Sequence, residues 1–158
     1  MDISSLAAEL VAAATAKGVT IGLAESCTGG LLSACITDIA GSSAVLQASL
    51  VTYSNEAKVS LLGVPAEVIV VHGAVSAEVA AAMVNGVLAR IDVDLVISIT
   101  GIAGPSGGST EKPIGTVWFG FGQRGRGVVT FHELFSGSRD EIRRQSVAYA
   151  LKMLSAEL

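Results

Sequence analysis

The stretch IGLAESCTGGLLSACI, residues 21–36, decides how the first part of the chain folds. It begins as an apolar run, places the polar segment ESCTGG at 25–30, and continues with apolar residues at helical spacing. A strand that passes through a glycine turn into a helix is typical of α/β folds. The polar segment is therefore predicted to lie where a strand ends and a helix begins, and open α/β sheets bind their ligands at such points.

Length and composition predict a single domain over residues 1–158. The chain is 51% hydrophobic, with only 15% charged and 4% aromatic residues, so its core must be built from Ala, Val, Leu and Ile. The net charge of −4 argues against a nucleic-acid partner. So little charge also predicts that some surface is covered in a homodimer or a higher homo-oligomer.

The ends of the chain and its cysteines indicate a cytoplasmic protein without a membrane partner. Residues 1–18 read as an amphipathic helix rather than a signal peptide, and no apolar run is long enough to span a bilayer. Cys27 and Cys35 match no disulfide or metal pattern, which indicates a reducing compartment. Arg139, Arg143 and Arg144 fall on a helix that also carries acids, and are predicted to form a solvated helix face.

Helices alternate with apolar strands, which predicts an α/β/α sandwich around a mixed sheet. The last two strands are predicted to form an antiparallel hairpin, and residues 65–76 a connection with an extended piece. Helices are expected at 2–17, 31–41, 55–63 and 77–91, and from Ser138 or Asp140 onward; strands are expected at 19–24, 46–54, 94–101, 116–122 and 127–135.

Three polar segments follow strands: ESCTGG at 25–30, TYSNEAK at 52–58 and TGIAGPSGG at 100–108. If these strands are parallel, the three segments meet at one edge of the sheet. Amides at a helix start are unpaired donors, so Ser26 or Thr28 would face a site for an anion or an oxyanion. An N-cap serine before a glycine turn explains the same residues equally well.

A serine nucleophile needs a base, and Lys58 lies one helical turn past a strand end. A partly buried lysine with a lowered pKa can take a hydroxyl proton. Tyr53 could donate a hydrogen bond into the same space. An ordinary exposed helix lysine and a rim aromatic are the structural alternatives.

The loop after Thr100 has glycines that let the backbone approach a phosphate closely, and two prolines that favour a preformed cradle. The glycines are Gly101, Gly104, Gly107 and Gly108, and the prolines are Pro105 and Pro113.

Other chemistries fit less well. His72 and His132 have no second ligand at metal spacing, so no metal site is predicted. A Ser-His-Asp triad through His72 stays formally possible, although this histidine reads more simply as part of a turn before a helix. Cys27 is an alternative nucleophile, but without a histidine partner it reads as a small packed residue.

Six segments together resemble the CinA C-terminal domain family, the nicotinamide-nucleotide amidohydrolases. They run in order over nearly the whole chain: AESCTGGLLS (24–33), TDIAGSSAVL (37–46), VTYSNEAKVSLLGVP (51–65), HGAVSAEVAAAM (72–83), ISITGIAGPSGGSTEKPIGTVWFGF (97–121) and GSRDEIRRQS (137–146).

The resemblance implies a three-layer α/β/α fold with a mixed, roughly five-stranded sheet and no metal or organic cofactor. It implies hydrolysis of the carboxamide of nicotinamide mononucleotide, a small-molecule nucleotide substrate, to nicotinate mononucleotide and ammonia. The implied catalytic residues are Ser26, Lys58, Tyr53 and Thr100. An arginine of the family falls on Arg139. We further expect the amides near Cys27 and Thr28 to hold the oxyanion, with Gly29 as a further substrate-binding residue of the turn, and the loop glycines with Arg139 to bind the substrate phosphate.

Two other readings stay open. One is a non-catalytic nucleotide-binding or regulatory module linked to competence or the DNA-damage response, in which Lys58 would be dispensable. The other is a structural oligomerisation domain, in which the glycine loop would only pack against a neighbour.

Overall fold

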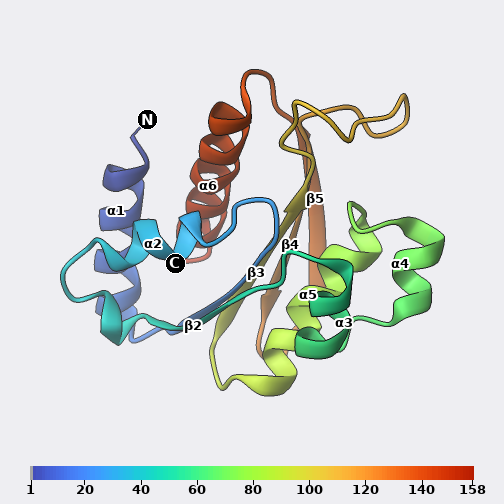
Figure 1. Cartoon of the computed structure of the whole chain (residues 1–158). Helices are drawn as coiled ribbons and strands as arrows, with labels where there is room; N and C mark the ends of the chain where they lie inside the picture. The colour runs from blue at the N-terminus through green and yellow to red at the C-terminus, as the bar shows by residue number, and fades with distance from the viewer. Residues whose placement is uncertain (1) are drawn as a thin grey trace.

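The computed structural model describes residues 2–158 as a five-stranded mixed sheet between two layers of helices (Figure 1). The strands are β1 (Ile21–Glu25), β2 (Leu46–Val51), β3 (Leu95–Gly101), β4 (Thr116–Gln123) and β5 (Val128–Leu134). The helices are α1 (Ile3–Lys17), α2 (Leu31–Thr37), α3 (Asn55–Leu62), α4 (Ala66–His72), α5 (Ala77–Arg90) and α6 (Arg139–Ala156), with a short 3₁₀ turn at Ser42–Ala44.

The sheet order is β2-β1-β3-β4-β5. Strand β1 pairs in parallel with both β2 and β3, whereas β4 is antiparallel to its neighbours β3 and β5. The predicted α/β/α sandwich, its mixed sheet and its terminal hairpin are therefore confirmed. The parallel arrangement of β2, β1 and β3 matters most for function, because it puts their carboxyl ends at one edge of the sheet.

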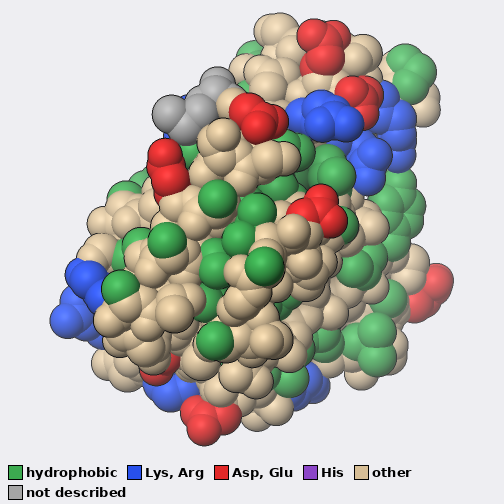
Figure 2. Space-filling view, turned by 90° about the vertical axis from the view of Figure 1, so that its left-hand side faces the viewer, with side chains coloured by type: hydrophobic (Ala, Val, Ile, Leu, Met, Phe, Trp, Pro, Cys, Tyr) green, Lys and Arg blue, Asp and Glu red, His purple; other side chains and the backbone are tan. Residues whose placement is uncertain are grey.

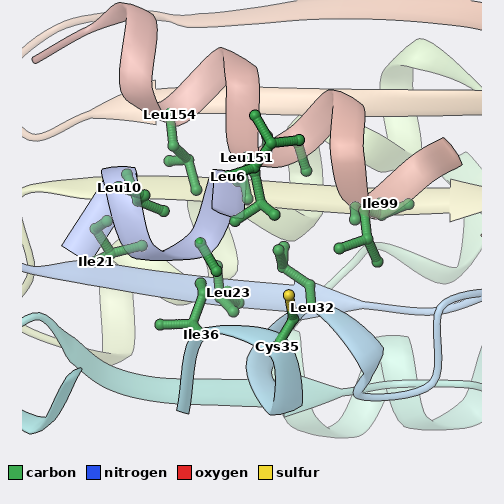
Figure 3. Packing of buried hydrophobic residues seen from close by; sticks show 14 of the residues in the cluster. Leu6, Leu10, Ile21, Leu23, Leu32, Cys35, Ile36, Ile99, Leu151 and Leu154 are labelled. Carbon is green, nitrogen blue, oxygen red and sulfur yellow. The ribbon is translucent and has the colours of Figure 1, made fainter. Parts of the chain in front are cut away.

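The core has two halves, one on each face of the sheet. Helices α1, α2 and α6 cover one face through aliphatic side chains such as Leu10, Leu32 and Leu151, which surround Leu23 of β1 (Figure 3). Helices α3, α4 and α5 cover the other face around Met83, Val84 and Val96. Figure 2 shows the outer surface of the layer that contains α1 and α2, and the middle of this surface has few charged side chains.

The helix boundaries follow local signals. Gly18 and Gly63 close α1 and α3 in the left-handed conformation, which glycine adopts without a steric penalty. Ser138 opens α6 with a capping box: its hydroxyl accepts from the Glu141 amide, while the Glu141 carboxylate accepts from the Ser138 amide.

The prediction for residues 65–76 is wrong, because Ala66–His72 form helix α4 instead of an extended piece. The β-branched run VIVV suggested a strand. In this run Ile69 is buried, whereas Val70 and Val71 are exposed. The segment therefore packs on the core with one face of a helix. Pro65 before the helix and Gly73 after it were the better signals, since proline starts helices and glycine ends them.

No helix within residues 2–158 combines the length and the apolarity that crossing a membrane requires.

Candidate active site

The three polar segments meet at one edge of the sheet and enclose a cavity of about 280 Å³. Segment 25–30 follows β1, segment 52–58 follows β2, and segment 100–108 begins at the end of β3. In Figure 1 the ochre loop that follows β3 and the start of α6 lie at the same end of the sheet. Of the predicted site residues, the following line this cavity: Ser26, Cys27, Tyr53, Lys58, Thr100, Gly101, Gly104, Gly107 and Arg139.

A serine and a lysine are in direct contact at the base of this cavity. Lys58 Nζ lies 3.0 Å from Ser26 Oγ, and the lysine side chain is only 1% exposed. The same Nζ donates to the carbonyl oxygens of Thr52 at 2.9 Å and Tyr53 at 3.3 Å. In its neutral form the amine has two hydrogens, which can go to these carbonyls, and one lone pair, which can accept the Ser26 hydroxyl.

Burial favours that neutral form. Removal of Lys58 from water lowers its pKa from the usual value, and no carboxylate contacts its Nζ among residues 2–158 to restore the charge. Ser26 is itself 7% exposed and reaches the Tyr53 carbonyl at 3.5 Å. The pair therefore has the geometry and the electrostatics of a base next to a hydroxyl nucleophile.

Glu25 holds the turn that carries Ser26, a role the sequence reasoning missed. Its fully buried carboxylate accepts from the Thr28 hydroxyl at 2.7 Å and from Ser49 Oγ at 3.3 Å. It also accepts from three amides at the start of α2, those of Gly30, Leu32 and Ser33, at 2.9 to 3.2 Å. The sequence holds no signal for this cap, because Glu25 lies six residues before the first residue of α2 and only the fold shows its burial.

Glu25 narrows the choice of anion-binding donors expected at this turn. The α2 amides that bond Glu25 are unavailable to a ligand, and the Thr28 hydroxyl is engaged as well. Among residues 2–158, the amides of Cys27 and Thr28 donate to no other residue. These two amides lie directly after the serine, so they are the available donors of the turn.

Arg139 joins the opposite walls of the cavity. One guanidinium nitrogen donates to the Gly104 carbonyl at 2.7 Å and another donates to Tyr53 Oη at 3.1 Å. Tyr53 is 60% exposed, so its hydroxyl lies at the mouth of the cavity rather than beside Ser26. A guanidinium has five donors, and the remaining ones can face a bound anion.

Thr100 and Gly104 shape the wall formed by the loop. The Thr100 hydroxyl donates to the Ala74 carbonyl at 2.9 Å and thereby fixes the segment before α5. Gly104 has a φ of +78°, and a Cβ atom at this position would lie 2.6 Å from a methyl group of Ile114. Only glycine fits there, because the loop folds back closely onto Ile114.

Three predicted residues do not line the cavity. The Thr28 side chain is turned toward Glu25, Gly29 is exposed with a φ of +57°, and Gly108 packs against Ile114. The structure adds lining residues that no motif singled out: Asn55, Ala74, Val75, Ile102, Ala103 and Ser106.

The prediction that the α6 arginines form a solvated face is correct only for Arg144, which pairs with Asp140 at 3.0 Å. Arg143 is half-buried and donates to the carbonyls of Cys27 at 3.1 Å and Thr28 at 2.9 Å. Sequence spacing could not show this, because the turn and α6 are far apart along the chain.

The alternative nucleophile and base have unsuitable surroundings. Burial raises the pKa of the Cys27 thiol to about 12, so it stays protonated and unreactive near neutral pH. His72 ends α4, lies 3.6 Å from Glu78 and does not line the cavity. Residues 2–158 contain no cluster of three or more His, Cys, Asp or Glu side chains arranged to hold a metal ion.

Comparison with known proteins places this geometry in a family. The model of the CinA C-terminal domain matches residues 3–158. The chain belongs to the CinA C-terminal domain family.

Relatives of this CinA domain occur both at similar length and within longer proteins. It is 51% identical over 154 residues to the nicotinamide-nucleotide amidohydrolase PncC of Escherichia coli K12, an alignment that covers 97% of this chain and 93% of that protein. A CinA-like protein of Geotalea daltonii is 51% identical over 142 residues, which cover 89% of this chain and 34% of that protein. The crystal structure of a competence/damage inducible protein from Agrobacterium tumefaciens superposes with a TM-score of 0.95 at 43% identity, covering 99% and 95% of the two chains.

The lowered pKa of Lys58 predicts a particular pH dependence of the stability of this CinA domain. Between the lowered pKa in the folded state and the usual pKa of 10.5, the unfolded chain binds the extra proton, so the free energy of unfolding rises with pH across that window. One proton contributes at most about 1.4 kcal/mol per pH unit. Lys58→Met should remove this contribution to the slope, as measured by urea unfolding at several pH values. The exposed control Lys17→Met should keep it; equal slopes for the wild type and Lys58→Met would contradict a shifted Lys58.

Proposed function

We propose that the protein is an amidohydrolase that converts nicotinamide mononucleotide to nicotinate mononucleotide and ammonia, with Ser26 as the nucleophile and Lys58 as the base. One observation carries the chemical part of the proposal: the 3.0 Å contact between a buried lysine and a serine that lines the cavity. The substrate is supported by the printed name of the E. coli relative and by the extent of the identity to it.

In the first half of the reaction, Ser26 Oγ attacks the carboxamide carbon while Lys58 Nζ takes the hydroxyl proton. The carbonyl oxygen becomes an oxyanion, which the amides of Cys27 and Thr28 stabilise. The C–N bond then breaks, and Lys58 returns its proton to the departing nitrogen, which leaves as ammonia. An acyl-enzyme ester on Ser26 remains.

In the second half, water attacks the ester carbon and gives its proton to Lys58. The tetrahedral intermediate collapses with release of the carboxylic acid, and Lys58 returns the proton to Ser26 Oγ. The lysine is neutral before each attack, which agrees with its lowered pKa. Tyr53, at the cavity mouth, would help relay a solvent proton to the ammonia as it departs.

The ribose phosphate would bind at the loop wall. Gly101, Gly104 and Gly107 line the cavity on that side, where backbone can approach a phosphate closely. Arg139 adds a positive charge with free donors beside them. In this proposal Thr100 acts as a positioning residue, since its hydroxyl is bonded to Ala74.

The reaction is tested by ammonia release from nicotinamide mononucleotide. Ser26→Ala and Lys58→Met should each lose nearly all turnover, by about 10³-fold or more, because neither attack nor proton transfer remains. Ser26→Ala should still bind the nucleotide, measured by calorimetry. Ser43→Ala and Lys17→Met, both exposed and outside the cavity, are the matched controls. Wild-type binding without turnover would favour the non-catalytic nucleotide-binding module.

We also propose that the chain works in the cytoplasm as a homo-oligomer. Exposed apolar side chains support self-association: Val70 is 84% exposed, Val71 72% and Leu134 61%. The two free buried cysteines are consistent with a reducing compartment. Light scattering of the purified protein should give a mass of at least two 16.0 kDa chains. A single-chain mass over the whole micromolar range would contradict the oligomer, and fractionation of expressing cells tests the location.

A further inference from the structure

Arg143 extends from α6 to the turn that carries Ser26, and it takes no part in the proposed bond formation or proton transfer. Its Nε donates to the Cys27 carbonyl at 3.1 Å and its Nη2 to the Thr28 carbonyl at 2.9 Å. These two acceptors belong to consecutive residues directly after Ser26. A planar guanidinium that bonds two carbonyls at once fixes both distance and direction, which a lysine cannot do.

The bond to the Cys27 carbonyl determines where the next amide points. In a trans peptide the C=O and the following N–H point in opposite directions. With the Cys27 carbonyl held on Arg143, the Thr28 amide is directed away from α6. In the preceding peptide the Gly29 amide donates to the Ser26 carbonyl at 2.9 Å, which fixes the direction of the Cys27 amide in the same way.

Charge gives Arg143 a second effect on this turn. Glu25 is fully buried and bonds the Thr28 hydroxyl of this turn, and its negative charge would oppose an oxyanion forming nearby. Arg143 offsets that charge. Both charges act on the Cys27 thiol. Burial has the largest effect and raises its pKa, Arg143 lowers this pKa, and Glu25 raises it.

We infer that Arg143 is a positioning residue that aims the Thr28 amide, next to the Cys27 amide, at the oxyanion of the acylation step and offsets the charge of Glu25. This inference rests on the proposed function. Arg143 itself does not line the cavity, so it acts on the transition state through the turn and not through contact with the substrate.

The kinetic test compares Arg143→Met with Arg144→Met, which removes the neighbouring guanidinium from an exposed ion pair. Arg143→Met should lower kcat for ammonia release by about 10²-fold, the size of effect expected when an oxyanion donor is lost, with KM changed less than about threefold. Arg144→Met should match the wild type. A raised KM with unchanged kcat, or equal losses in both variants, would overturn the inference.

Rescue separates positioning from loss of fold. Guanidinium ion at roughly 10 mM, well below denaturing concentrations, should restore part of kcat to Arg143→Ala and none to Ser26→Ala. Arg143→Lys should fall between the wild type and Arg143→Met, because it keeps the charge but not the paired bonds. Absence of rescue together with a Lys variant no better than Met would contradict the positioning role.

A substrate-independent readout keeps this test apart from the proposed function. A fluorophosphonate reacts when Ser26 Oγ displaces fluoride from phosphorus, and the proton of the Ser26 hydroxyl passes to solvent. The P=O oxygen of the adduct then occupies the oxyanion site. The labelling rate should fall at least tenfold in Arg143→Met and stay unchanged in Arg144→Met. If the wild type shows no turnover of nicotinamide mononucleotide but labelling depends on Arg143, the substrate is wrong and the positioning role stands. If turnover occurs and neither turnover nor labelling depends on Arg143, the inference falls alone.

Discussion

The contact between Lys58 and Ser26 depends on a buried amine that two main-chain carbonyls hold in place. Thr52 and Tyr53 supply those carbonyls, and both lie just after the end of β2. Ser26 lies just after the end of β1, which pairs in parallel with β2. The base and the nucleophile therefore approach each other because two parallel strands end at the same level, and the sheet that sets this level is packed on both faces.

The acid in ESCTGG explains why an apolar chain is interrupted at this point. Glu25 ends β1 inside the protein, and its charge is stabilised by the donors at the start of α2 and by Thr28. The turn between them is thereby fixed on α2, and Arg143 of α6 bonds two of its carbonyls. What remains free is a short stretch of backbone after Ser26, which is the part of the turn that the proposed chemistry needs.

Much of this arrangement could be predicted from the sequence, because the signals were local. The alternation of apolar strands and helices gave the layers, and the three polar segments at strand ends indicated the edge where the cavity lies. Lys58 stood out because the chain has few lysines and this one follows a strand end. The prediction for 65–76 failed because β-branched residues favour strands locally, whereas packing of Ile69 favours the helix.

The contacts between distant segments could not be predicted. Nothing in the sequence around Arg139 or Arg143 shows that one bonds Tyr53 and the other the Ser26 turn, because both contacts depend on how α6 lies on the sheet. The buried role of Glu25 was missed for a related reason. An acid after a short apolar strand reads as a strand end, and only the fold shows that it caps the next helix.

The most direct test of whether Lys58 activates Ser26 is the pKa of Lys58. The chain has four lysines, Lys17, Lys58, Lys112 and Lys152, so an NMR titration of ¹³Cε-labelled lysine gives four curves, and the curve that disappears in Lys58→Met belongs to Lys58. We expect Lys58 to titrate below the usual 10.5. A Lys58 curve at or above 10.5 would show a charged lysine at rest, and would contradict its assignment as the base that activates Ser26.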